Sequence, residues 1–295
     1  MKIGIVSWNI RHLRPQKVAD YIDYITPRLI YGRIAILYEN KIDNNQNDEL
    51  CDLLAQTMVD KMPDSVVECK SLAVPVGTNE NVVVVYVSKC KTGPNSKTPN
   101  TNISIEVRHN PTFDQQLATK GQYAMEHSYN ETVMANIQMA RADFRIPAIL
   151  EVKVTKQGQA AKIINIMAWH APGPATGLPP LLWNVFQPIL YNHVDLYVGD
   201  FNMTGLKGKA PITPICLHRT NQSTTFTKGG PVPHAEGLDL VFRNHLRIGD
   251  RAMPVQVDDE FIGRATVQVI APGGDLDTAF DVSDHLPVYI ELKEV

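Results

Sequence analysis

Near its C-terminal end this chain reads Ser283-Asp284-His285-Leu286-Pro287-Val288, a polar cluster that leads directly into an apolar, strand-like run. Earlier in the chain Gly199-Asp200-Phe201-Asn202 follows the strand-like run 194–198. Polar residues at strand ends are well placed to face a cleft. An Asp–His pair, an Asp-x-Asn pair and further carboxylates together indicate metal-assisted attack on a phosphorus ester.

Length and composition predict a globular protein with a substantial core. The 295 residues fit one large domain or two small ones, and we expect a single domain over residues 1–295. Residues 109–143 are polar and weakly helical, and we interpret them as an insertion within that domain. A net charge of -3 argues against a protein that coats nucleic acid by bulk charge, but not against an enzyme that grips a few phosphates.

The N-terminus reads as a first strand and not as a signal peptide, because its apolar run is short and lacks a small-residue cleavage site. No apolar run approaches the roughly 20 residues of a membrane span. We therefore expect a cytoplasmic protein without stable membrane association, although a protein exported without a signal peptide would look the same. Four cysteines show neither a C-x-x-C pair nor zinc spacing, which favours free or buried thiols and leaves disulfides open: Cys51, Cys69, Cys90 and Cys216.

Apolar runs alternate with helical periodicity along the chain, and the polar segment Gly77–Asn81 is typical of a hairpin. Many strands, joined partly by hairpins and partly by helices, predict mixed sheets and not one parallel sheet. Asn47 is the expected N-cap of a helix that follows it. The expected strands are 2–8, 34–38, 66–76, 82–87, 103–107, 148–154, 162–169, 194–198, 238–242, 267–270 and 288–292, and the expected helices are 15–29, 48–62 and 181–191.

Six short segments carry polar groups at predicted strand ends. A lone carboxylate in such a place is usually a cap or a solvated loop residue, but six segments in one chain are harder to dismiss. Asp200 and Asn202 lie two residues apart on an extended chain and therefore point to one side. The polar residues are Asn9, Glu39, His170, Asp200 with Asn202, Asp239, and Asp284 with His285.

In this order, Trp-Asn, Glu, Trp-His-Ala-Pro, Gly-Asp-Phe-Asn, Leu-Asp and Ser-Asp-His-Leu-Pro-Val resemble the endonuclease/exonuclease/phosphatase superfamily. The resemblance runs from Ser7 to Val288 and is nearest in motif style to the pancreatic deoxyribonuclease and cytolethal distending toxin nuclease branches. It implies a DNase I-like, four-layer α/β sandwich: two mixed β-sheets packed face to face, with helices outside. It also places an active site at one end of the sandwich.

The resemblance implies a site for Mg²⁺, with Mn²⁺ as a substitute, whose protein ligands are Asn9, Glu39 and Asp284. Hard oxygen donors of this kind suit Mg²⁺, which keeps several waters. The segment Asp143–Ala148 resembles the arginine-bearing stretch of the deoxyribonuclease branch, so that Arg145 is expected to contact the substrate phosphate.

By the same resemblance His285 is the general base, and Asp200 positions or deprotonates the attacking water. Asn202 donates to a phosphoryl oxygen. His170, oriented by Asp239, acts as donor or acid. The division of acid and base roles between the two histidines differs among family members and stays open.

The expected activity is hydrolysis of a phosphodiester, with DNA as the substrate. The alternative within the same fold is a phosphatase or phospholipase that acts on inositol phosphate or sphingomyelin. It stays open because Val85-Tyr86-Val87-Ser88-Lys89 lacks an arginine that relatives cutting DNA often carry. Lys89, Lys91 and Lys97 are the nearby candidates for phosphate contacts. A non-catalytic binding module of this fold would usually have lost part of the polar set, and this chain retains it.

Overall fold

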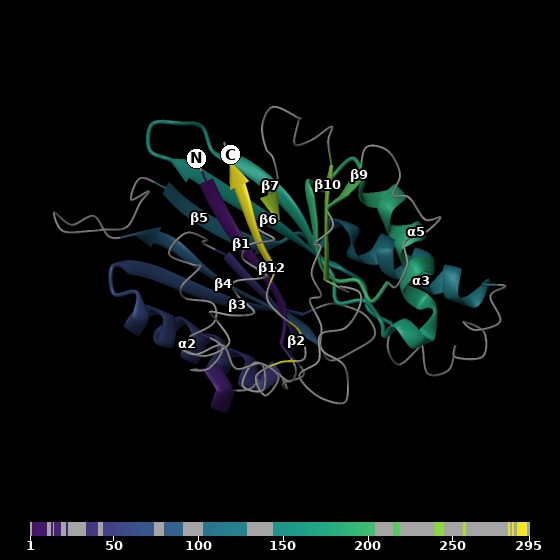
Figure 1. The fold of residues 1–295 in the computed structure, drawn as a ribbon, viewed down its shortest axis with the longest axis horizontal. Coiled ribbons are helices and arrows are strands. Elements are labelled where there is room, and N and C mark those ends of the chain that lie inside the picture. The colour runs from purple at the N-terminus through teal and green to yellow at the C-terminus, as the bar shows by residue number, and fades with distance from the viewer. Residues whose placement is uncertain are drawn as a thin grey trace.

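Two six-stranded sheets pack face to face in the computed structural model of this protein (Figure 1). Helices cover the outer face of each sheet, as Figure 1 shows with α2 on one side and α3 and α5 on the other. The residues that the structure describes are 2–10, 13, 15–18, 22, 34–40, 44–73, 80–90, 103–128, 144–203, 215–218, 239–244, 256–257, 283, 285 and 288–293.

Sheet A contains the first and last described strands of the chain and has the order β11-β12-β1-β2-β4-β3. Strands β1 and β2 are parallel, and every other neighbouring pair is antiparallel. Strands β3 and β4 pair with Ala73 opposite Asn81, which confirms the predicted pairing of these two runs. The strands are β1 (Lys2–Asn9), β2 (Ile34–Asn40), β3 (Ser65–Ala73), β4 (Asn81–Cys90), β11 (Gln256–Val257) and β12 (Val288–Lys293).

Sheet B comes from the middle of the chain and has the order β5-β6-β7-β8-β10-β9. Among the described strands of this sheet, only β7 and β8 are parallel, because the helix α5 connects them, and all other neighbours are antiparallel. The prediction of mixed sheets is therefore confirmed. The strands are β5 (Ile103–His109), β6 (Ala148–Lys156), β7 (Lys162–Ala168), β8 (Leu196–Asp200), β9 (Ile215–His218) and β10 (Asp239–Asn244). The expected strand 267–270 lies outside the described residues, and the sequence did not predict β9 or β11.

The helices differ from the prediction mainly at their ends. Helix α2 begins at Asn44, so the prediction of Asn47 as its N-cap was wrong: this residue is buried inside the first turns. The expected helix 15–29 is described only at 15–18 and 22. Residues 111–126 of the expected insertion form η2 and α3, and residues 129–143 lie outside the described part. The helical elements are η1 (Pro15–Lys17), α2 (Asn44–Lys61), η2 (Pro111–Phe113), α3 (Asp114–Glu126), η3 (Pro174–Thr176) and α5 (Leu178–Leu190).

Two hydrophobic clusters hold these layers together. The first lies between the sheets and continues under α2, where Leu50, Leu54 and Met58 are fully buried. The second lies between sheet B and the helices α3 and α5, with Trp169 and Trp183 among its aromatic side chains. Each such buried side chain contributes about 1.5–3 kcal/mol relative to exposure. Layers in the order helix, sheet, sheet, helix confirm the predicted four-layer sandwich. Among the described helices none is long and apolar enough to cross a membrane.

Candidate active site

One end of the sandwich collects the polar residues because of the strand directions. The parallel pairs β1–β2 and β7–β8 both end there, and the antiparallel neighbours of these strands begin there. A residue just after a parallel strand thus lies near a residue just before an antiparallel one. The register pairs at this end are Ser7 with Val288, Asn40 with Asn81, Ala168 with Ala148, and Asp200 with Asp239.

The centre of the site is a contact between the two sheets. Asn9, the last residue of β1, donates from Nδ2 to Oδ2 of Asp200, the last residue of β8, at 3.0 Å. The same Nδ2 lies 3.4 Å from Nε2 of His170 and 3.4 Å from Nε2 of His285. Both histidines therefore point at one place. Asn9 Oδ1 is buried and has no hydrogen-bond partner among the described residues.

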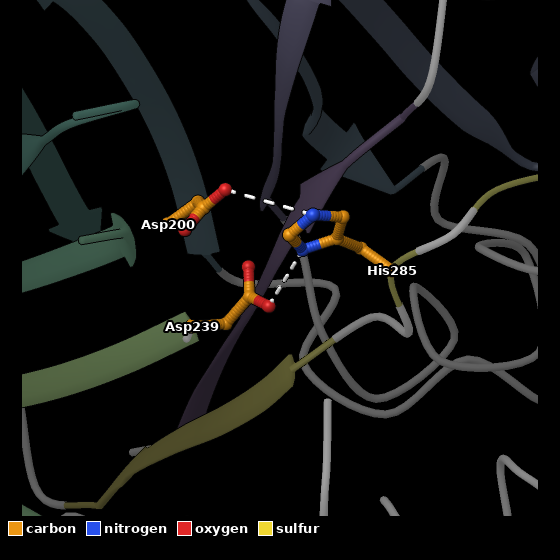
Figure 2. Close-up of side chains that lie close together, drawn as sticks. All are labelled: Asp200, Asp239 and His285. Atoms are coloured by element: carbon orange, nitrogen blue, oxygen red, sulfur yellow. Dashed lines mark hydrogen bonds and ion pairs between the residues drawn. The ribbon is translucent and has the colours of Figure 1, made fainter. Parts of the chain in front are cut away.

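His285 is held by a carboxylate of the opposite sheet (Figure 2). Its Nδ1–H donates to Oδ2 of Asp239 at 2.9 Å, and its Nε2 lies 3.6 Å from Oδ2 of Asp200. Since the carboxylate accepts from Nδ1, the neutral ring carries no proton on Nε2, which can then accept one. The main chain is also fixed: Trp8 Nε1 donates to the His285 carbonyl at 2.8 Å, and the His285 N–H donates to Ser283 Oγ at 3.1 Å.

His170 has a carboxylate partner that the sequence analysis missed. Its Nδ1 lies 2.9 Å from Oε2 of Glu80, the residue just before β4. The expectation that Asp239 orients His170 was therefore wrong, because Asp239 pairs with His285. Arg145 completes the group, with Nη1 3.3 Å from Glu80 Oε2 and 2.8 and 2.9 Å from the two ring nitrogens of His170.

Two residues with positive φ shape the end of β8 and the turn after it. Gly199 has φ 140°, and a Cβ there would lie 2.0 Å from the carbonyl oxygen of Trp169, so only glycine allows this approach. Asn202 has φ 48°, a left-handed conformation that asparagine tolerates better than most residues. Its amide donates to the Ala171 carbonyl at 3.0 Å and to Asp200 Oδ2 at 3.2 Å, which fixes the carboxylate.

A buried tyrosine lies beneath the site and joins the two sheets. Tyr38 of β2 has its hydroxyl 3.2 Å from Ser7 Oγ and donates to the Val198 carbonyl of sheet B at 3.3 Å. Its ring centroid is 6.5 Å from that of His170. Burial raises the pKa of Tyr38 above its usual range, and the nearby Asp239 and Asp200 raise it further, so the hydroxyl stays protonated and can donate.

The site has donors suited to a metal ion. Asp200, Asp239 and His285 place ligand atoms within 4.8 Å of one another. His285 and Asp239 already bond to each other. Asn9 Oδ1, by contrast, is a buried oxygen without a hydrogen-bond partner among the described residues. Oxygen donors of this kind fit a hard divalent cation. The backbone of Glu39 lies at the end of β2, its side chain is outside the described part, and so is Asp284.

Of the lysine candidates, the structure describes Lys89, and it lies far from the site. Lys89 is exposed near the end of β4, and Glu80 directly precedes the start of the same strand. At about 3.3 Å per residue the strand separates them by roughly 30 Å. The expectation that Lys89 contacts substrate phosphate at this site was therefore wrong. Lys91 and Lys97 lie outside the described residues.

No protein-family model matches the sequence, and no curated protein matches it. Solved structures do match over nearly the whole chain. Humanized D. rerio TDP2 covers 99% of this chain and 99% of its own, at 12% identity and a TM-score of 0.52. An endonuclease/exonuclease/phosphatase family protein from Bacteroides thetaiotaomicron covers 99% and 97%, at 12% identity and a TM-score of 0.50.

A further match is D. rerio TDP2 complexed with single strand DNA product, which covers 98% of each chain at 13% identity and a TM-score of 0.50. These likenesses establish the fold. It is the DNase I-like fold of the endonuclease/exonuclease/phosphatase superfamily, as the motif order predicted.

Proposed function

We propose that this protein is a metal-dependent phosphodiesterase that cleaves DNA by attack of an activated water. One observation carries the proposal: two histidines, each paired with a carboxylate, direct their Nε2 atoms at the same amide of Asn9, beside Asp200. Hydrolysis of a diester needs a base for the water and an acid for the poor alkoxide leaving group. Two poised imidazoles supply one group for each task.

His285 is the base in this proposal. Asp239 accepts from Nδ1 at 2.9 Å, so that Nε2 can take a proton from water and the resulting imidazolium is stabilised by the carboxylate. Asp200 lies 3.6 Å from that Nε2 and orients the water. Asn202 fixes the Asp200 carboxylate through its own amide and main-chain N–H.

His170 is the acid. Glu80 lies 2.9 Å from its Nδ1 and orients the ring, so that a proton on Nε2 can go to the departing oxygen. Arg145 lies beside both groups and carries the positive charge that a phosphate oxygen would meet. Such an acid suits a phosphoester whose leaving group is a poor alkoxide, as in DNA.

The metal in this proposal is Mg²⁺, with Mn²⁺ as a substitute, held by Asn9, Glu39 and Asp284. The buried, unsatisfied Oδ1 of Asn9 supports this choice within the described residues. When bound, the cation would polarise a phosphoryl oxygen and stabilise the charge that develops on it. The residues of this chain orient the water, move the protons and bind the phosphate.

The acid–base pairs and Arg145 suit any phosphoester with an alkoxide leaving group, and the choice of DNA among them rests on a solved structure of the same fold. A protein of the same fold, D. rerio TDP2, has been solved with a single strand DNA product, which is consistent with a DNA substrate. The net charge of -3 means that binding would depend on local cations and not on bulk charge.

The test is hydrolysis by the full chain with Mg²⁺, on supercoiled plasmid, RNA, inositol phosphates and sphingomyelin in parallel. We expect nicked plasmid, and we expect His285→Ala and His170→Ala to lower kcat by about 10²–10⁴-fold. His127→Ala is the control, because His127 lies at the end of α3 and stacks on Tyr123 away from the site. Hydrolysis of sphingomyelin or inositol phosphate without nicking would change the substrate, and no hydrolysis of any of them would refute the proposal.

A further inference from the structure

We infer that Trp8 and Ser283 are positioning residues that fix the main chain of His285 and so aim its imidazole at Asn9 and Asp200. The inference rests on the proposed function for its catalytic consequence, but its structural content can be tested without activity. The structure gives both side chains specific hydrogen bonds to the segment that carries His285.

The need for such bonds follows from the pairing of β1 with β12. Their continuous register ends where Ser7 lies opposite Val288, and beyond that point His285 forms an isolated bridge. His285 precedes β12 and stands past the end of the register. Side-chain hydrogen bonds also connect the two segments in this region. Trp8 Nε1 donates to the His285 carbonyl at 2.8 Å, and Ser283 Oγ donates to the Asn9 carbonyl at 2.8 Å.

Ser283 makes a two-way connection. Its hydroxyl donates to the carbonyl of Asn9 and accepts the N–H of His285 at 3.1 Å. It therefore joins the residue at the centre of the site to the main chain of the histidine that faces it. Both Ser283 and Trp8 are 1% exposed, so water cannot replace their bonds without a rearrangement.

His285 is thereby held at three points: the carbonyl by Trp8, the N–H by Ser283 and Nδ1 by Asp239. The Asp239 bond alone fixes one ring atom and leaves the main chain free to shift. A displacement of about 1 Å in a catalytic group can lower the rate by about 10²-fold. Loss of either main-chain bond should therefore reduce turnover and leave substrate binding largely unchanged.

Two conservative substitutions test the inference, and the chain offers a matched control for each. Trp8→Phe removes the indole N–H that bonds to His285, whereas Trp183→Phe removes a buried indole N–H without a partner among the described residues. Ser283→Ala removes the bridging hydroxyl, whereas Ser65→Ala removes a buried hydroxyl that likewise has no described partner. The controls reproduce the loss of volume without the loss of a contact to His285.

The first measurement is long-range ¹H–¹⁵N NMR of the histidine rings, with the His285 signals assigned through His285→Gln. We expect the ring signals of His285 to move in Trp8→Phe and Ser283→Ala and to stay in place in both controls. The His170 signals should change less, because its ring is held by Glu80. Unmoved His285 signals in both variants would overturn the inference, whatever the activity of the protein.

The second measurement is kcat and KM on the diester that the wild type hydrolyses. We expect kcat to fall about 10- to 100-fold in each variant, with KM unchanged, while both controls keep the wild-type kcat. The double variant should lose less than the product of the two single effects, since both act through one main-chain segment. Fully multiplicative losses, or equal losses in the controls, would show a general structural effect and contradict the inference. A wild type inactive on all substrates would refute the proposed function and leave the NMR result to decide this inference.

Discussion

Glu80→Gln is the most informative perturbation of the site, because it removes the charge of a residue that touches both His170 and Arg145. Glu80 is 9% exposed at its side chain and lies 2.9 Å from His170 Nδ1 and 3.3 Å from Arg145 Nη1. At 3.3 Å and an effective dielectric constant of about 20, the attraction to Arg145 is about 5 kcal/mol. Desolvation offsets much of this attraction, but removing one partner of a buried pair still costs about 3–5 kcal/mol.

Two effects of Glu80→Gln should therefore appear together. The free energy of unfolding should fall by about 3 kcal/mol, which lowers Tm by roughly 10 °C in a protein of this size. The kcat should fall by about 10²-fold or more, because His170 loses the carboxylate that bonds to its Nδ1 and orients its ring. Thermal melts and single-turnover plasmid cleavage measure the two effects separately.

The double variant Glu80→Gln, Arg145→Gln separates stability from catalysis. Removing both charges should restore most of the lost Tm, because no buried charge is left without its counterion, while kcat stays low. Glu151→Gln is the control for losing an ion pair: Glu151 bonds to the 64% exposed Arg108 on the strands β5 and β6, where the loss should be within about 1 kcal/mol. A Glu80→Gln protein with wild-type kcat would refute the acid role of His170.

Three further predictions concern the metal, the phosphate contact and the turn after β8. EDTA should abolish activity, and added Mg²⁺ should restore it. Asn9→Ala should weaken Mg²⁺ binding in isothermal titration calorimetry, and an unaltered Mg²⁺ affinity would show that Asn9 is not a ligand. Arg145→Gln should flatten the slope of log KM against log salt concentration by about one unit. Lys89→Gln, at the far end of β4, should leave this slope unchanged. A slope that changes in Lys89→Gln and not in Arg145→Gln would place the DNA elsewhere. Gly199→Ala should lower the free energy of unfolding in urea by more than about 3 kcal/mol, because the alanine Cβ would lie 2.0 Å from the Trp169 carbonyl oxygen. An unchanged urea midpoint of unfolding would contradict this geometry.

The layers of the fold could be predicted because burial on both sides of a sheet leaves long apolar runs. Val82–Val85 is fully β-branched and becomes the buried part of β4. The helix over 114–126 was harder to recognise, because its buried residues are few. Gly121 lies between Leu117 and Met125 on this helix, and its lack of a side chain leaves room for the ring of Phe144. Such a contact is not visible as hydrophobic periodicity.

The motifs singled out Asn9, His170, Asp200, Asp239 and His285, which the structure brings together, but they did not indicate how these residues pair. Motifs mark residues that follow parallel strands, such as His170 and Asp200. Glu80 was missed because it lies in a polar hairpin segment and belongs to none of the motifs, although, like His285, it lies just before an antiparallel strand. Asp239 was given the wrong histidine, since strand order in the sheets decides the pairing and the motifs do not encode it.

Each histidine and its carboxylate come from different sheets: His170 of sheet B meets Glu80 of sheet A, and His285 of sheet A meets Asp239 of sheet B. A chain that has formed only one sheet carries one half of each pair and cannot assemble either. The segment 103–244, which builds all of sheet B, thus remains chemically inert until it docks on strands from both ends of the chain. Under the proposed function, turnover therefore reports sheet docking, and partly folded molecules are expected to be inactive.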